Sequence, residues 1–366
     1  MYSRNMEIRV SFTLMNRVFS MSKNYIICLK TIAVSIIVAS MFVSFNKKQP
    51  PVNIIFDTDI APDYDDVGAM ALLHAFADKD EANILATISS NTFETTGPTI
   101  SVLNTYFNRP HIPIGVAKGV FPNKECQQHW AQAIIERYPH SLQSNGDAID
   151  AVELYRKILS SQPDKSVTIV TVGFFTNLAG LLESKADEFS DLSGRQLVIK
   201  KVKQLVSMAC SLRNGNSGYE FNVTTDAAAS ERVFKDWPTP VTLTGFEIGE
   251  KILTGIRLIH DNTINNSPVK DAFTIALAKD RNTVGRNSWD ETAVLVAVKG
   301  LSPYFGSRKL NFTILPDGKD SIIPGNKFSY LTFKQTPEEI GRTIENLMMH
   351  QPENQNQSVP RLPQHR

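Results

Sequence analysis

The sequence is poor in cysteine and carries no excess of charge of either sign. Its 366 residues include three cysteines, which are far apart and form no C-x-x-C pair. This pattern indicates neither a disulfide framework nor a cysteine zinc site. Lys plus Arg number 38 and Asp plus Glu number 37, which gives a formal net charge of +1. With no basic excess and no acidic tail, we expect no nucleic-acid partner.

Long apolar runs are also scarce, and the one that stands out lies near the N-terminus. Lys23 and Lys30 precede an apolar stretch over residues 31–45, and two further lysines follow it. A charged start and a short apolar core are typical of a secretory signal, whereas a membrane-spanning helix needs about 20 apolar residues. We predict that residues 1–50 are a signal or anchor segment of a secreted, periplasmic or envelope-anchored protein. A buried helix of the fold is the alternative reading, and membrane contact is expected only through this segment if it stays uncleaved.

The rest of the chain alternates between apolar strands and amphipathic helices without an internal repeat. Hydrophobic residues make up 42% of the sequence, enough for a sizeable core. We expect strands at 52–56, 82–90, 112–117, 167–172, 203–209, 241–246, 309–315 and 328–333, and helices at 67–78, 97–107, 147–161, 176–189, 225–237, 271–280, 290–298 and 336–350. Continuously apolar strands separated by helices predict a mostly parallel open sheet with helices on both faces. Residues 51–350 are therefore read as one α/β domain, and the Gln/Asn/Pro-rich stretch 351–366 as a disordered tail.

An acidic stretch directly follows the first predicted strand. In "IIFDTDIAPDYDD", five carboxylates fall within ten positions, at Asp57, Asp59, Asp63, Asp65 and Asp66. In open α/β sheets, ligands bind outside the carboxyl ends of the strands. Any one of these residues could simply cap the next helix, but a cap does not explain five. A hard divalent cation such as Ca²⁺, which takes six to eight oxygen ligands, would neutralise them.

Two known designs begin with an apolar strand followed by D-x-D. One is the haloacid-dehalogenase-type phosphatase, in which Asp57 would be the nucleophile and Mg²⁺ the metal, but this chain has Ile60 and Ala61 where Gly-Thr is usual. The other is the nucleoside hydrolase family, whose loop reads D-x-D-x-x-x-D-D before an apolar helix. The stretch "DTDIAPDYDDVGAMALL" resembles that loop with two extra residues, and Asp63 lies in the enlargement with no assigned role.

Four later segments, in the right order, are similar to segments of the same family. They are "ILATISSNTFETT", "VTIVTVGFFTNLAGLL", "RNGNSGYEFNVTTDAAA" and "SWDETAVLVAV", and with the acidic loop they cover about residues 52–300. The family positions that they match are Asn91, Val172, Asn214, Glu220, Asn222, Asp226 and Asp290. The chain is thus identified as resembling the inosine-uridine preferring nucleoside hydrolase family.

That resemblance implies hydrolysis of the N-ribosyl bond of a small-molecule nucleoside or related N-riboside. By analogy Asp59, Asp66, Asp290 and the main-chain carbonyl of Val172 would hold Ca²⁺, which binds a water molecule and the ribose diol. Asp59 would take the proton of that water, and the base would leave through an oxocarbenium-like transition state. The residues expected to hold the sugar hydroxyls are Asp65, Asn214, Glu220 and Asn222, with Asn91 assisting. Asp57 is expected to have a supporting hydrogen-bond role, and the family implies a dimer or tetramer.

One position departs from the family pattern. Many members have a His directly before the late metal-binding Asp, near the leaving base, and this chain has Trp289. An indole can stack on a base or sugar but cannot donate a proton as an imidazolium can. Activation of the leaving group is therefore unassigned. Glu247 and Glu250 fit either the pocket or a solvated turn. A second hypothesis stays open, a Ca²⁺-dependent nucleoside- or ribose-binding protein without turnover, as does the Mg²⁺ phosphatase.

Overall fold

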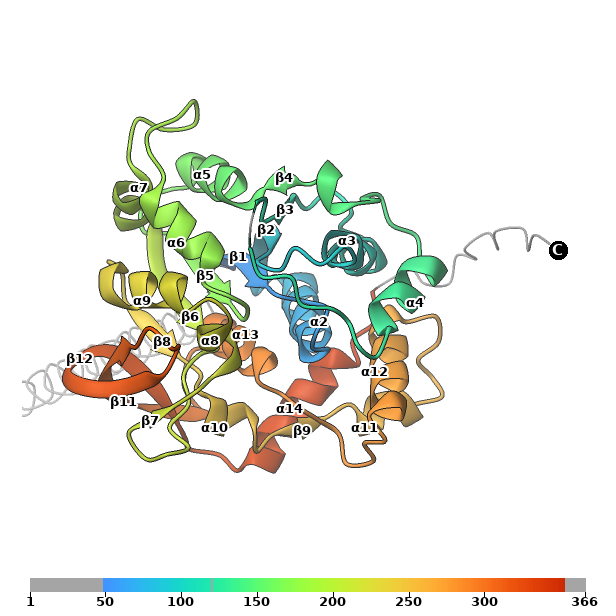
Figure 1. Ribbon diagram of the computed structural model, residues 1–366. Helices are drawn as coiled ribbons and strands as arrows, with labels where there is room; N and C mark the ends of the chain where they lie inside the picture. Colours follow the sequence, from blue (N-terminus) through green and yellow to red (C-terminus); the bar gives the residue numbers. More distant parts are fainter. Residues whose placement is uncertain (1–48, 120, 353–366) are drawn as a thin grey trace, which may run out of the picture. The chain divides into compact units, whose positions relative to one another are not determined.

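The computed structural model describes residues 49–119 and 121–352 (Figure 1). The predicted N-terminal segment and C-terminal tail lie almost entirely outside these residues. None of the helices in the described part is both long and apolar enough to cross a bilayer.

The strands form a mostly parallel open sheet, as predicted. Its spatial order is β11-β12-β8-β6-β5-β1-β2-β3-β4, and among its described strands the antiparallel pairs are those of β12 with β11 and with the short β7. The bounds are β1 Val52–Thr58, β2 Ala82–Ser89, β3 Ile114–Val116, β4 Ile149–Asp150, β5 Val167–Thr171, β6 Val202–Ser207, β7 Ser217–Gly218, β8 Val241–Leu243, β11 Phe305–Ile314 and β12 Asp320–Phe333. A separate pair joins β9 (Leu253–Thr254) to β10 (Arg286–Asn287).

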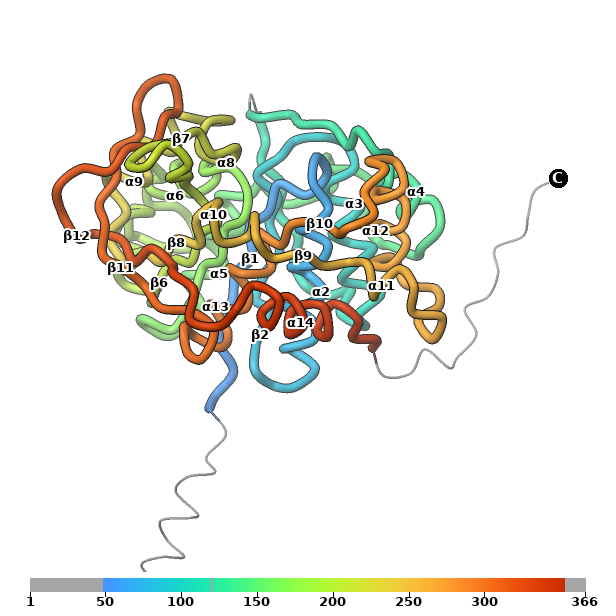
Figure 2. Tube along the Cα trace, turned by 90° about the horizontal axis from the view of Figure 1, so that it is seen from below, coloured from blue at the N-terminus to red at the C-terminus, as the bar shows by residue number. Residues whose placement is uncertain are grey.

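Helices cover both faces of the sheet. They are α2 Asp65–Asp78, α3 Thr96–Tyr106, α4 Trp130–Arg137, α5 Ala151–Ser161, α6 Thr176–Glu183, α7 Gly194–Lys201, α8 Phe221–Thr225, α9 Ala227–Asp236, α10 Phe246–Gly249, α11 Ile256–His260, α12 Pro268–Lys279, α13 Asp290–Lys299 and α14 Pro337–Met348, with a 3₁₀ turn at Asn145–Asp147. Figure 1 shows α5, α6, α7 and α9 grouped on one side of the strands. Figure 2 shows α14 running beside β9 and α2 on the other.

The central strand β1 explains why both faces are apolar. Ile54 and Phe56 belong to the core that contains α2, α3, α13 and α14, whereas Ile55 belongs to the core that contains α5, α6, α7 and α9. Successive side chains of a strand point to opposite faces, so a strand buried on both sides must be apolar at every position. This is the reason that the apolar runs predicted the parallel sheet.

The fourth predicted helix is shorter than expected. The helix expected over 176–189 ends at Glu183, and the Thr176 hydroxyl does not cap it. Instead the Thr176 hydroxyl donates to Asp226 at 2.6 Å. Asp226 in turn caps α9 by accepting from the main-chain nitrogen of Ala229, so this contact ties two neighbouring helices together.

The topology also places the functional loops. β1 lies between β5 and β2, and β6 lies on the other side of β5, with all these pairs parallel. The chain leaves β1 toward β2 and leaves β5 toward β6, so these two connections run in opposite directions across the sheet. Such a switch point opens a crevice at the carboxyl ends of the strands, and the acidic loop after β1 lies there.

Candidate active site

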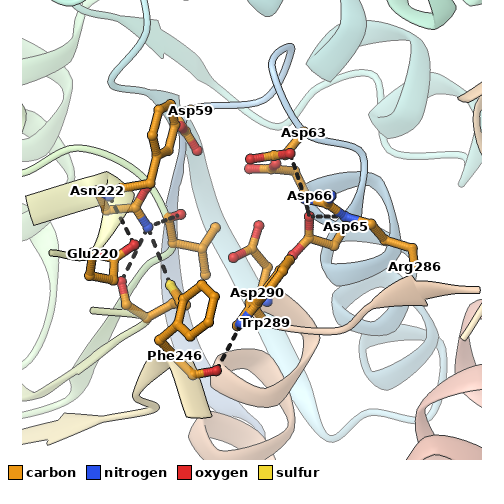
Figure 3. Close-up of a pocket in the computed structure, with 13 residues that line it drawn as sticks. Asp59, Asp63, Asp65, Asp66, Glu220, Asn222, Phe246, Arg286, Trp289 and Asp290 are labelled. Carbon is orange, nitrogen blue, oxygen red and sulfur yellow. Dashed lines mark hydrogen bonds and ion pairs between the residues drawn. The ribbon is translucent and has the colours of Figure 1, made fainter. Parts of the chain in front are cut away.

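A pocket of about 210 Å³ lies at this crevice (Figure 3). Most of the residues predicted to form a site line it, although they come from segments far apart in the sequence. The lining residues are Asp59, Asp63, Asp65, Asp66, Val172, Met208, Glu220, Phe221, Asn222, Phe246, Arg286, Trp289 and Asp290.

The acidic loop reaches the pocket because α2 begins at its closing Asp pair. Asp65 and Asp66 occupy the first turn of α2, where the partial positive charge of the helix N-terminus favours carboxylates. The Thr58 hydroxyl, at the end of β1, hydrogen-bonds to one oxygen of Asp66. The other oxygen of Asp66 is buried and has no hydrogen-bond partner.

Three buried carboxylates come together as a candidate cation site. One oxygen from each of Asp65, Asp66 and Asp290 lies within 4.8 Å of the others. Two of these residues, Asp66 and Asp290, were predicted as metal ligands, whereas Asp65 was predicted to hold the sugar. The other two predicted ligands, Asp59 and Val172, line the same pocket, and the Asp59 carboxylate falls outside this group of three.

The electrostatics of these groups support a site for a cation. Burial, followed by repulsion between neighbouring carboxylates, raises the pKa of Asp59 and Asp290 well above the usual range. The same two causes raise the pKa of Asp66, against a smaller lowering by the Thr58 hydroxyl. Asp59 and Asp66 each keep one buried oxygen without a partner. Buried carboxylates without protein donors are suited to a hard divalent cation, so the residues fit the group that the family resemblance implies.

Arg286, which the sequence reasoning missed, is the one cation among the described lining residues. Its guanidinium donates to Asp65 at 3.0 and 2.7 Å and to Asp63 at 2.5 Å. The same group lies 4.9 Å from the ring centre of Tyr64 and 5.0 Å from that of Trp289. This gives Asp63, previously without a role, a partner inside the pocket. No motif flagged Arg286, because the ion pair joins positions more than 200 residues apart.

Glu220 and Asn222 line the pocket on the side opposite Asp63, Asp65 and Asp66 (Figure 3). Glu220 caps α8 by accepting from the main-chain nitrogens of Asn222 at 2.9 Å and Val223 at 3.1 Å. Burial raises the pKa of Glu220 to about 8, against the lowering by these two bonds. The Asn222 amide donates to the main-chain carbonyls of Val172 at 2.9 Å and Met208 at 3.2 Å. Asn222 thus fixes the carbonyl that the resemblance assigns to the metal.

Two predicted sugar-binding residues do not reach the pocket lining. Asn91 is buried, and its amide donates to the main-chain carbonyls of Asp59 and Lys124 while its oxygen accepts from the main-chain nitrogens of Phe93 and Lys124. Its polar atoms are therefore occupied in holding the acidic loop. Asn214 is exposed in a turn closed by its main-chain bond to Ser217. The spacing from Asn214 to Glu220 did not reveal this turn.

Three aromatic side chains, Phe221, Phe246 and Trp289, also line the pocket, and two of them are in contact. The Trp289 indole donates to the main-chain carbonyl of Phe246 at 2.9 Å. The rings of Phe246 and Trp289 lie 5.1 Å apart. Figure 3 shows this pair beside Asp290.

The remaining candidate residues do not line the pocket. Asp57 is buried and accepts from the Tyr155 hydroxyl at 2.8 Å and the Asn177 amide at 3.1 Å, which matches the supporting role predicted for it. Glu247 accepts from the Ser211 and Tyr330 hydroxyls. Glu250 pairs with Arg213 instead of entering the pocket.

Comparison with known proteins agrees with this arrangement. The model of the family described as inosine-uridine preferring nucleoside hydrolase matches residues 54–361. The pyrimidine-specific ribonucleoside hydrolase RihA of Shewanella sp. strain MR-4 is 30% identical over 204 residues, covering 53% of this chain and 59% of that protein. The homologous RihA of strain ANA-3 is 34% identical over 103 residues, 28% of this chain and 29% of that protein. The matches thus span 59% and 29% of these two relatives, less than two thirds of each.

Solved structures show the same fold at low sequence identity. A plant nucleoside hydrolase, the PpNRh1 enzyme, aligns with a TM-score of 0.61 at 18% identity, over 82% of this chain and 99% of that one. The purine-preferring ribonucleoside hydrolase from Gardnerella vaginalis aligns with a TM-score of 0.62 at 15% identity, over 81% of this chain and 99% of that one.

Proposed function

Because the chain belongs to the inosine-uridine preferring nucleoside hydrolase family, we propose that it hydrolyses the N-glycosidic bond of nucleosides or related N-ribosides. The observation that carries this proposal is the convergence of Asp65, Asp66 and Asp290 with Asp59 and Glu220 in one pocket at the strand ends. The substrate is a small molecule, and the N-terminal segment supports a secreted, periplasmic or envelope-bound location.

Asp66 and Asp290 would hold a divalent cation, together with Asp65 and with Asp59 and the Val172 carbonyl at the same pocket. All of these donors are oxygen atoms, which favours Ca²⁺. Such a cation supplies positive charge that lowers the pKa of a bound water and anchors a sugar diol.

The protein's own residues can accept the proton, hold the sugar and stabilise the developing charge. Asp59 has a buried oxygen without a protein partner, so it can accept the proton that the attacking water loses. Glu220 and Asn222 face the acidic loop across the pocket and can hold the sugar hydroxyls between them. The carboxylate lining stabilises positive charge that develops on the sugar, and that charge is larger in the transition state than in a neutral nucleoside.

A Ca²⁺-dependent nucleoside- or ribose-binding protein is the second candidate. The observation in its favour is that no imidazole is among the described lining residues, so no histidine protonates the leaving base there. The phosphatase alternative is disfavoured, because Asp57 does not line the pocket and one of its oxygens is already bonded to Tyr155 and Asn177.

A release assay tests the proposal. We expect ribose, measured as reducing sugar, from at least one member of a nucleoside panel in the presence of Ca²⁺, and none from Asp59→Ala. Calcium-dependent nucleoside binding with no turnover over days would support the binding protein instead. Phosphate release from a generic aryl phosphate would support the phosphatase hypothesis instead.

A further inference from the structure

The loop that carries Glu220 into the pocket is closed at its base. This loop, residues 211–220, follows β6 and leads directly into α8. At the base, a Cβ added to Gly218 would lie only 2.3 Å from the main-chain oxygen of Ser211. The two ends of the loop are therefore in direct contact, and the exposed turn with Asn214 lies between them. Because Glu220 comes two residues after Gly218, the geometry of this base determines where Glu220 lies.

Asp320, the first residue of β12, joins the two ends of this loop. Its carboxylate accepts from the main-chain nitrogen of Ser211 at 3.1 Å. Its main chain pairs with Gly218 in the antiparallel contact between β7 and β12. Asp320 is fully buried. Burial raises the pKa of Asp320 to about 6, while main-chain N–H groups of Ser211, Asp320 and Glu220 oppose that rise. One side chain thus faces main-chain donors at both ends of the loop.

A second contact from β12 holds the start of the same loop. The Tyr330 hydroxyl donates to one oxygen of Glu247 at 2.6 Å, and the other oxygen of Glu247 accepts from the Ser211 hydroxyl at 3.2 Å. The main-chain nitrogen of Leu212 also donates to that second oxygen. The preceding residue, Cys210, is buried and has φ of +71°, which is unfavourable for a residue with a Cβ. Such a conformation persists only where surrounding contacts hold it.

We propose that Asp320 is a positioning residue that acts through Glu220, which rests on the proposed N-ribosyl hydrolysis. Asp320 does not line the pocket, so its effect reaches the sugar site through the base of the loop. Glu220 accepts from the main-chain nitrogen of Asn222, and the Asn222 amide donates to the Val172 carbonyl. The C-terminal hairpin of β11 and β12 thereby sets the position of the pocket wall that would hold the sugar hydroxyls.

Kinetics on the full chain with Ca²⁺ test this role. The probes are uridine, inosine and 4-nitrophenyl riboside, whose leaving group departs without an acid. Asp320→Ala removes the acceptor of the Ser211 N–H. A displacement of about 1 Å in a site can cost about 100-fold, so we expect kcat/KM to fall about 10-fold to 100-fold for each probe that the wild type hydrolyses. Asp320→Asn keeps an oxygen for that N–H and should stay within about threefold of the wild type. An equal loss in both variants overturns the proposal.

A double variant separates positioning from a general weakening of the fold. If Asp320 acts through Glu220, adding Asp320→Ala to Glu220→Ala should lower kcat/KM by less than about threefold further, because the positioned group is already gone. Losses that multiply overturn the proposal. Tyr330→Phe provides the same test if Asp320→Ala does not fold. It removes only the hydroxyl bond to Glu247, and its expected loss of about fivefold should also disappear in the Glu220→Ala background.

Hydrogen exchange followed by mass spectrometry tests the contact without any turnover. In Asp320→Ala, the main-chain amides of residues 211–222 should exchange about tenfold faster or more, whereas those of α2 should be unchanged. Unchanged exchange over residues 211–222 overturns the proposal. If the wild type hydrolyses none of the three probes, the hydrolase function fails instead, and the exchange rates still decide whether Asp320 holds the loop.

Tyr219→Phe is the matched control from the same hairpin contact. It removes an exposed hydroxyl bond to Asp317 at 2.9 Å, in the turn between β11 and β12, directly beside Glu220 in the sequence. Tyr219 does not line the pocket, so this variant should change neither the kinetics nor the exchange over residues 211–222. A loss as large as that of Asp320→Ala would show that any change at the hairpin disturbs the loop, and it would overturn the specific role of Asp320.

Discussion

Arg286 and Asp65 form an ion pair in which two guanidinium nitrogens bond to the same carboxylate oxygen, at 3.0 and 2.7 Å. The Asp65 side chain is 2% exposed and the Arg286 side chain 17%. The pair joins the first turn of α2 to the strand β10, four positions before Asp290. It therefore fixes the enlarged acidic loop against the late helix that completes the cation site.

Removing the Arg286 side chain should destabilise the folded protein. Arg286→Met leaves Asp65 and Asp63 without their shared counter-charge, and breaking a buried pair from one side costs about 3 kcal/mol. We expect the free energy of unfolding, measured by urea titration without divalent cations, to fall by about this amount. Asp63→Asn is the matched control, because Asp63 is 38% exposed and its share of the pair should be worth less than about 1 kcal/mol. An equal fall in the free energy of unfolding of the two variants would contradict the view that the Arg286–Asp65 contact provides most of the stabilisation.

Asp66 should make stability depend on calcium. Ca²⁺ at about 100 times its dissociation constant stabilises a protein by about 2.7 kcal/mol, so thermal unfolding of the wild type should move upward when it is added. Asp66→Asn should lose most of that response. The metal-free variant should be more stable than the metal-free wild type, because one of the facing buried carboxylates is gone. Asp150→Asn, which keeps a good cap at the start of α5, should respond to calcium normally.

The sequence predicted the parts of this site that follow from strand ends and helix starts. Asp59, Asp66 and Asp290 each lie beside such a boundary, and the periodicity of apolar residues locates those boundaries well. Asn91 and Asn214 show the limit of that reasoning. Both follow predicted strands, yet one is buried with its amide occupied by main-chain groups and the other points into an exposed turn. Local spacing does not say which way a loop side chain faces.

Arg286 shows a second limit. Its partners lie more than 200 residues away, and its place in the pocket depends on how β9 and β10 pair. Likewise, Thr176 starts a helix as a good cap would, but its hydroxyl bonds to Asp226. In both cases the partner of the side chain is set by a tertiary contact, which local sequence does not indicate.

His74 should give the protein a measurable acid sensitivity away from the pocket. It is fully buried in α2, donates from Nε2 to the side-chain oxygen of Asn104 at 3.1 Å, and stacks on Phe107. Burial, as the largest cause, lowers its pKa from 6.5 to about 3. The unfolded chain therefore binds more protons than the folded one between these values. The stability that His74 contributes is complete above about pH 6.5 and declines as pH falls toward 3, by up to about 1.4 kcal/mol per pH unit.

A variant isolates that contribution from other buried groups. Burial raises the pKa of Asp57 to about 7, which by itself makes stability fall as pH rises, so the wild-type slope is a sum of opposing effects. In His74→Gln, which keeps a donor for Asn104, the free energy of unfolding should fall less steeply between pH 6 and 4 than in the wild type. Identical slopes from urea titrations at those two pH values would contradict the assignment.

Trp289→His should change which base the protein can release. A histidine at this position would place an imidazolium beside Phe246 and Asp290, where it could protonate a departing neutral base. We expect kcat/KM for inosine or uridine to rise, with a new dependence on pH near the pKa of about 6.5 of an ordinary histidine. Trp289→Phe is the control, since both variants lose the indole bond to Phe246 but only one gains a proton donor. A rise of the same size in Trp289→Phe would show that pocket shape, and not proton supply, limits hydrolysis of these nucleosides.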